Sequence, residues 1–496
     1  MRKQWYQVLR VVVWSLACGV VTLGSPARTE AGQLKDDLTL TLSDRIRGEF
    51  VDWFEPHQGK APTGQQRYDF LGNQLRVGAK LKNGPVLFTV EVQDTELVNL
   101  PNDASLAAPY GNLGPGALYF ANTRKRDQRE TFLKQANVTL TNLPGLAGSS
   151  ATIGRLEYAD GSETTPSDPA LAWVKRSRIA ERLVGPFGYT HVTRSLDGAR
   201  AAYDAPLFNV TAMGGRPTQG GFEISANREL DVYLAGLAAT LKQIPNFAPF
   251  DARLFYLFYE DQRLGAVKTD NRPLAARRAD GDHISIHTFG AHAITVADAG
   301  PGKVDGLLWG AAQTGDWGTL SHDAWAYAAE AGYQLPKVFA APWVRGGFNA
   351  SSGDGNSADH RHATFSQLLP TARIYAQFPF FNLMNNQDLF LQVILKPHSR
   401  VTLRSDYHWL RLTTSKDLWY AGGGATSNQF FGFSGTPSSG HRELAYLTDV
   451  SATISILKQL TAYAYYGRSF GQRVVKGTFP GGDTANYGYV ELTYRY

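Results

Sequence analysis

Residues 38–50, LTLTLSDRIRGEF, carry the pattern that decides the fold. From Leu38 onward every second residue is apolar except Asp44 and Gly48, and the residues between them are polar or charged. Successive side chains of a strand point to opposite faces, so this stretch predicts a strand with one apolar and one polar face. A soluble strand usually has about 5–6 residues. A longer one with a wholly polar second face is typical of a membrane barrel around a wet lumen.

The same alternation recurs along the chain. Asn83-Gly84-Pro85 separates two such runs and predicts a hairpin, which Pro85 makes longer than a two-residue turn. At the C-terminus, apolar residues at every second position lead to the final Tyr496, a pattern that resembles the signal for bacterial barrel-assembly machinery. The alternating runs are 74–82, 86–93, 372–378, 401–408 and 489–496.

The connections between these runs are of unequal length. Residues 99–124 and 421–440 are long and rich in Gly, Asn, Ser and Pro, whereas 83–85 is short. Short periplasmic turns at one end and long extracellular loops at the other are typical of outer-membrane barrels. Residues 176–182 are compatible with a helix inside a loop. No linker divides the chain, so we expect a single barrel domain over residues 28–496.

The N-terminus reads as a cleavable signal peptide, residues 1–27. Basic residues at positions 2, 3 and 10 precede an apolar run from Val11 to Leu23, and small residues around Ala27 offer a cleavage site. The apolar run is shorter than the roughly 20 residues of a membrane-spanning helix. Cys18 raises the alternative of a lipoprotein, but the apolar run continues beyond it. Cleavage removes three cations and the only cysteine, so the formal net charge of +5 becomes nearly balanced.

Composition and length narrow the class. The chain is 12% aromatic and has 50 glycines but only three methionines, which suits strands and tight turns. A large soluble β-protein has a similar composition, and the long amphipathic runs decide against it. At roughly 10 residues per membrane strand, the mature chain has room for about 16 to 18 strands. The sequence therefore predicts an all-β, antiparallel transmembrane barrel in the outer membrane of a Gram-negative envelope.

Two sets of short motifs resemble the alginate-export family of outer-membrane porins. The first is Gly154-Arg155-Leu156 with Asp160-Gly161, followed by residues 194–200, RSLDGAR. The second runs from Ser352-Gly353-Asp354 through Thr364-Phe365, Leu368-Leu369-Pro370, Asn382-Leu383 and Pro397 to Tyr407-His408-Trp409 and residues 417–420, DLWY. The resemblance implies an 18-stranded monomeric barrel with a narrow, basic lumen for an acidic polysaccharide such as alginate.

Arginines recur on the polar faces and are the first candidates for the pore lining. Guanidinium groups bind carboxylates through a two-pronged fork, and rings of Arg or Lys select anions in pores. The same arginines can instead pair with lumenal acids and brace the barrel. Arg155 is the least secure member because Ile153 shares its parity. The candidate pore-lining residues are Arg45, Arg47, Glu49, Arg76, Lys80, Arg155, Arg200, Arg345, Arg373, Arg404, Asp406 and His408.

Other constellations give weaker signals. Asp354, Asn356 and Asp359 have oxygen ligands near calcium spacing, but a glycine-rich loop uses such residues for turns. His360 and His362 flank Arg361 in the same loop. His408 beside Asp406 suggests acid–base work, although residues two apart on a strand simply share a face. We expect no cofactor, no resident metal and no catalytic site.

The leading hypothesis is a passive, anion-selective channel for an acidic polysaccharide or oligosaccharide. The alternatives are a general porin for small anions, a barrel enzyme, or a structural outer-membrane protein. The expected partners are the saccharide, outer-membrane lipid, the barrel-assembly machinery and periplasmic export proteins, and the nearly neutral mature chain gives no reason to expect nucleic acid.

Overall fold

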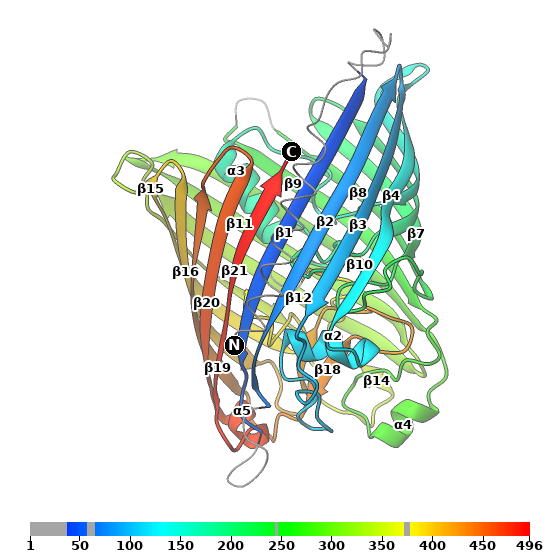
Figure 1. The fold of residues 1–496 in the computed structure, drawn as a ribbon, viewed down its shortest axis with the longest axis vertical. Helices are drawn as coiled ribbons and strands as arrows, with labels where there is room; N and C mark the ends of the chain where they lie inside the picture. The colour runs from blue at the N-terminus through cyan, green and yellow to red at the C-terminus, as the bar shows by residue number, and fades with distance from the viewer. Residues whose placement is uncertain (1–36, 57–64, 244–246, 372–376) are drawn as a thin grey trace.

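The computed structural model describes residues 37–56, 65–243, 247–371 and 377–496. An 18-stranded antiparallel barrel forms the wall (Figure 1). Its strands are β1 (Leu38–Asp52), β2 (Arg67–Asn83), β3 (Val86–Val98), β4 (Gln128–Leu143), β5 (Leu146–Leu156), β6 (Leu196–Asp204), β7 (Phe208–Pro217), β8 (Val232–Leu241), β9 (Phe250–Asp261), β10 (Ile284–Ala299), β11 (Gly302–Trp317), β12 (Leu320–Gln334), β13 (Trp343–Ser351), β15 (Asn386–His398), β16 (Val401–Leu412), β19 (Glu443–Ser455), β20 (Leu460–Gly471) and β21 (Thr484–Arg495).

Each wall strand pairs antiparallel with the next, and β21 returns to β1 to close the barrel, with Leu492 opposite Ile46. Closure leaves no unpaired edge in the wall. The remaining elements belong to the connections. They are the strands β14 (Arg361–His362), β17 (Trp419–Gly422) and β18 (Phe433–Thr436), the helices α2 (Pro115–Thr123), α3 (Pro169–Val174), α4 (Leu274–Ala279) and α5 (Arg473–Thr478), and the π-helical turn η1 (Lys175–Ile179).

The predicted alternation is the organising feature of the wall. In β12 buried and exposed residues alternate from Leu320 to Glu330 and beyond, and the outward residues of the barrel are large and apolar. Leu254, Leu308 and Ile153 are each more than 60% exposed. Such an apolar exterior is stable only against lipid, whereas the inward faces carry charged and amide side chains. Among the described residues, no helix is long and apolar enough to cross a membrane.

The two ends of the barrel differ as the loop lengths predicted. Gly84-Pro85, Gly300-Pro301 and Ser399-Arg400 connect strands at one end, where β1 begins and β21 ends. Figure 1 places the helices α2, α4 and α5 at the opposite end, which carries the long loops. Asn83 lies opposite Val86, so the first hairpin is a two-residue turn despite Pro85. By the rule for outer-membrane barrels, the short-turn end is periplasmic.

One predicted strand is not confirmed. Of the alternating run 372–378, residues 372–376, including Arg373, lie outside the described residues. Gln377 and Phe378 are not in a strand but in the connection between β13 and β15. Phe378 is fully buried against other aromatic rings inside the barrel, so this residue packs within a connection and does not face lipid.

Candidate functional site

Two long connections turn inward and cross the lumen. The β5–β6 segment, residues 157–195, contacts inward-facing residues of strands from opposite sides of the barrel, such as Glu49 on β1 and Glu330 on β12. The β13–β15 segment, residues 352–371 and 377–385, lies against it, with the Leu369 amide donating to the Leu183 carbonyl at 2.9 Å. The lumen and these two segments form the candidate site, because any solute must pass them.

Glu330 anchors the β5–β6 segment by charge. The segment brings Arg178 to Glu330 with two hydrogen bonds of 2.8 Å, and Arg182 follows at 3.1 Å. From the wall, Arg345 reaches Glu330 at 3.3 Å and Asp305 at 2.9 Å. The side chains of all five residues are almost completely buried. Arg178 projects from η1, whose widened turn is a geometry often found at functional sites.

On the opposite side, wall arginines hold the same segment by its backbone. Arg45 donates to the Gly188 carbonyl at 2.9 Å and also to the carbonyl of Thr190, and Arg47 donates to the carbonyl of Tyr189 at 2.7 Å. Arg47 is further paired with Glu491 at 2.6 Å. Arg45 also lies 3.8 Å from Glu491, so both arginines hold the segment through its carbonyl groups while sharing one carboxylate.

His191 locks the segment against the β1–β2 wall. Its Nε2 lies 2.9 Å from Glu49, and its ring occupies the space above Gly72, where an added Cβ would lie 2.2 Å from the ring. Gly72 is therefore required by a close approach. Burial lowers the pKa of His191 to about 4, so the ring is neutral at ordinary pH.

Asp417 anchors the β13–β15 segment without a cation. Its carboxylate accepts hydrogen bonds from the Asp354 amide at 2.9 Å, the Thr364 hydroxyl at 2.6 Å, the Tyr420 hydroxyl at 2.7 Å and the Leu418 amide at 2.7 Å. Burial raises the pKa of Asp417 to about 6, although these four donors favour its charged form. The motif residues Asp354, Thr364, Asp417 and Tyr420 thus meet at one buried carboxylate.

The other motif residues mark where the β5–β6 segment leaves and rejoins the wall. Arg155 and Asp197 are cross-strand partners joined by a bidentate salt bridge, and Gly154 lies opposite Gly198. Gly154 has φ of 121° and Gly198 lies against the Gly214 carbonyl, so neither position admits a Cβ. Arg155 shares the outward parity of Ile153 and also donates to the outward-facing region at Leu133 and Asn227. It belongs to the outer side of the wall and not to the pore lining.

Among the described residues, the other predicted pore-lining side chains face the interior and differ in their partners. Arg76 contacts Gln93, Thr193 and Glu157, and Arg404 is bidentate to Asp406. His408 bonds to Asp388. Lys80 is exposed near the short-turn end. Within the described part of the chain, the buried Nε of Arg200 has no hydrogen-bond partner.

Several site residues were not predicted. Arg178 and Arg182 lie in the stretch compatible with a loop helix, and Glu330 lies on the inward face of β12. Nothing in the sequence shows that these residues meet across 148 or more positions.

In the loop with near-calcium spacing, the side chains of Asp354, Asn356 and Asp359 each accept a hydrogen bond from the backbone amide two residues later, which is the geometry of a turn. His362 stacks on Trp317 and contacts His322, whereas the backbone carbonyl of His360 accepts a hydrogen bond of 3.1 Å from the Ser321 amide of β12.

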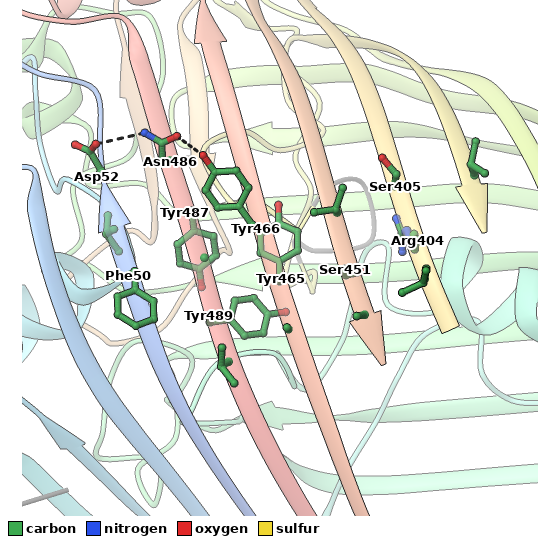
Figure 2. A pocket seen from close by; sticks show the side chains of 18 of the residues that line it. Phe50, Asp52, Arg404, Ser405, Ser451, Tyr465, Tyr466, Asn486, Tyr487 and Tyr489 are labelled. Atoms are coloured by element: carbon green, nitrogen blue, oxygen red, sulfur yellow. Dashed lines mark hydrogen bonds between the residues drawn. The ribbon is translucent and has the colours of Figure 1, made fainter. Parts of the chain in front are cut away.

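The outer wall has its own hollow, of about 650 Å³, across β15, β16, β19, β20, β21 and β1. Its exposed members, including Phe50, Tyr466 and Val490, face outward, while Tyr465, Tyr487 and Tyr489 are buried beneath them. Figure 2 shows Asn486 bridging Asp52 and the Tyr466 hydroxyl at its margin. The lining is almost entirely apolar, which suits lipid chains and separates this hollow from the charged lumen.

Comparison with known proteins identifies a matching family and solved structures with a similar fold. The model of the alginate export family matches residues 37–471. Among solved structures, the chain is similar to OccAB2 of Acinetobacter baumannii, with a TM-score of 0.58 and 10% identity, over 94% of this chain and 99% of that one. It is also similar to OccK9 (OpdG) of Pseudomonas aeruginosa, with a TM-score of 0.54 and 10% identity, over 93% and 99%. OpdK of Pseudomonas aeruginosa crystallised with vanillate gives a TM-score of 0.53 and 8% identity, over 92% and 98%. These identities show a shared fold only. No curated protein matches the sequence significantly.

Proposed function

Because the chain belongs to the alginate-export family, we propose that its outer-membrane barrel is an anion-selective channel for an acidic polysaccharide or oligosaccharide. The proposal assigns it to a Gram-negative envelope and gives it no catalytic role. Carboxylated sugars pass such a pore when fixed cations replace their lost hydration, provided that each contact is weak enough to release them.

The observation that carries the proposal is the set of inward cations that are not neutralised by a carboxylate contact. The buried Nε of Arg200 has no hydrogen-bond partner within the described residues. Arg176, in η1 on the β5–β6 segment, is exposed between the buried Lys175 and Arg178. These guanidinium groups keep their charge available to an anion.

The paired arginines serve the bracing role that the sequence left open. Arg47, Arg345 and Arg404 each contact a carboxylate at short distance, so they hold the wall and the inner segments in place. We propose that selection and bracing are divided between different arginines. The carboxylate-free group attracts the substrate, and the paired group fixes the lumen's cross-section.

A second candidate function is uptake of small carboxylates. OpdK, which shares the fold, was crystallised with vanillate, a small aromatic carboxylate. The two segments that cross the lumen favour a small solute over a polymer unless they move during passage. Both functions require an anion-selective pore, so they differ in which solute blocks the current.

Single-channel recording in planar bilayers tests these functions. In a potassium chloride gradient, the reversal potential of the wild type should show preference for chloride. Oligouronates should block the current more strongly than neutral oligosaccharides of equal length. If vanillate blocks and oligouronates do not, the small-carboxylate function replaces the saccharide function. A pore that prefers potassium would contradict both.

Two substitutions and a matched control locate the selectivity. Arg176→Gln combined with Arg200→Gln should reduce the chloride preference and the oligouronate block by several-fold, most clearly at low salt, because fixed lumenal charge acts over a Debye length of about 8–10 Å. Arg129→Gln combined with Arg67→Gln removes the same two charges from the exposed pairs with Asp94 and Asp52 on the outside of the wall. It should leave both readouts unchanged.

A further inference from the structure

Three side chains on neighbouring wall strands converge inside the barrel. Asp406 and His408 share the inward face of β16, and Asp449 of β19 is the cross-strand partner of Asp406. Each of the three places one possible metal-ligating atom within 4.8 Å of the other two. All three residues are at most 3% exposed. Ligand atoms of one transition-metal ion lie at most roughly 4 Å apart, so small side-chain adjustments let a single ion contact all three atoms.

The two ring nitrogens of His408 are unequally used. Nδ1 lies 2.9 Å and 3.1 Å from the two carboxylate oxygens of Asp388, which fixes the ring and places the proton on Nδ1. Nε2 is buried and has no hydrogen-bond partner within the described residues. A carboxylate on one imidazole nitrogen and a free lone pair on the other is the arrangement by which histidines bind metals. An unsatisfied buried acceptor is otherwise unfavourable.

From this geometry we infer that Asp406, His408 and Asp449 bind one divalent transition-metal ion. One imidazole and two carboxylates suit ions such as Zn²⁺, Co²⁺ or Mn²⁺, whereas Ca²⁺ and Mg²⁺ prefer all-oxygen sites. Water fills the remaining coordination positions. The site is distinct from the channel function and would be a staple between β16 and β19.

Charge balance supports a cation at this point. Within the described part of the chain, the group around His408 contains the carboxylates of Asp388, Asp406 and Asp449 and one guanidinium, that of Arg404. Arg178 lies over the neighbouring Phe390 ring and is paired with Glu330. With a neutral imidazole the group carries two excess negative charges, which a divalent ion compensates. Buried carboxylates in excess are otherwise costly.

The neighbouring contacts leave room for coordination. The Arg404 Nε is shared between the two oxygens of Asp406, at 3.1 Å to Oδ1 and 2.8 Å to Oδ2, and Gln392 donates to Oδ1 at 2.9 Å. The Tyr465 hydroxyl donates to Asp449 Oδ2 at 3.0 Å and orients that carboxylate. Each proposed ligand thus has a second group that holds it in position, as metal sites require.

Binding of Co²⁺ alone to the full-length barrel tests the inference. Metal is first removed by chelation. The protein is then folded into detergent micelles either with Co²⁺ present, so that a buried site can fill during folding, or without it, with Co²⁺ added afterwards. We expect one Co²⁺ per chain, a visible absorption band of the bound ion, and a higher unfolding temperature that added Zn²⁺ reproduces. A wild-type barrel that binds no Co²⁺ under both conditions would overturn the proposal.

Variants separate a metal site from a hydrogen-bonded cluster. His408→Gln and Asp449→Asn should abolish the absorption band, and Asp388→Asn should weaken affinity by about 10–100-fold because it removes the group that orients the ligand. The matched control is His292→Gln, which removes another buried histidine, bonded to Asp251 at 2.8 Å. It should bind Co²⁺ like the wild type. If His408→Gln also keeps one tightly bound Co²⁺, the ion lies elsewhere and the site assignment is wrong.

Discussion

Two buried carboxylates hold the two segments that cross the lumen, and they do so by different chemistry. Glu330 receives Arg178, Arg182 and Arg345, whereas Asp417 receives two hydroxyl groups and two backbone amides. Both side chains are shielded from water. The first anchor is an ion-pair network and the second is a neutral hydrogen-bond hub.

This difference shows how burial sets the desolvation free energy of each anchor. A buried ion pair repays its desolvation only when every charge is matched, so loss of one partner leaves an uncompensated charge. A carboxylate with neutral donors carries its desolvation cost alone, and the raised pKa of Asp417 reports that cost. The β5–β6 segment is therefore held independently of pH near neutrality, and the β13–β15 segment is the pH-sensitive one.

The largest effect is expected at Glu330. Glu330→Gln keeps the shape but removes from Arg178 and Arg182 the buried carboxylate that both contact, while Arg345 retains Asp305. The free energy of unfolding should fall by about 3–5 kcal/mol. Urea titration in lipid vesicles measures this loss. An unchanged stability would mean that the network contributes no net energy.

A smaller loss is expected at the neutral hub. Asp417→Ala leaves the buried hydroxyl groups of Thr364 and Tyr420 without their acceptor. Each unsatisfied buried group costs about 1–3 kcal/mol, and removal of the carboxylate's own desolvation cost offsets part of it. The same titration should therefore show a smaller loss than for Glu330→Gln. If the order is reversed, the comparison between charged and neutral anchors fails.

The pH dependence of the hub has a defined sign. Burial raises the folded-state pKa of Asp417 to about 6, above the value of 3.8 for a free carboxyl group. The folded state therefore binds a proton more readily than the unfolded state, and stability rises as the pH falls through 6 toward 4. Relative to Asp417→Asn, which does not titrate, the wild type should gain about 1–3 kcal/mol between pH 7.5 and pH 4.5. A constant difference would contradict the assignment.

The wall was predictable because its signal is local. The alternation in residues 38–50 specifies one face for lipid and one for the lumen, and β1 follows it from Leu38 to Asp52. The same reasoning misplaced Gln377 and Phe378, which lie in a connection, with Phe378 buried inside the barrel. Alternation reports which side chains are buried, and it does not distinguish a lipid-facing strand from a segment packed inside the barrel.

The site was predictable only in part. Parity placed Arg45, Arg47, Arg345 and Arg404 in the lumen, but their partners lie on segments far away in sequence, and the sequence gives no sign of which carboxylate each one meets. Gly154 illustrates this limit. Its backbone has a φ of 121° near the end of β5, and the sequence does not show that the chain takes this conformation there. The division between arginines that brace and arginines that remain available is a tertiary property.

The smallest effect is expected at Asp323, which lies on the same strand as Glu330 and extends the comparison to an exposed ion pair. Asp323 pairs with Arg361 at 3.1 Å, but the two side chains are 70% and 55% exposed. Water and salt screen such a pair, and holding two long side chains in place costs entropy, so it contributes about 0–1 kcal/mol. Asp323→Asn should change the free energy of unfolding by less than about 1 kcal/mol, and high salt should remove what remains. A loss comparable with that of Glu330→Gln would show that charge matching, and not burial, determines the strength of these anchors.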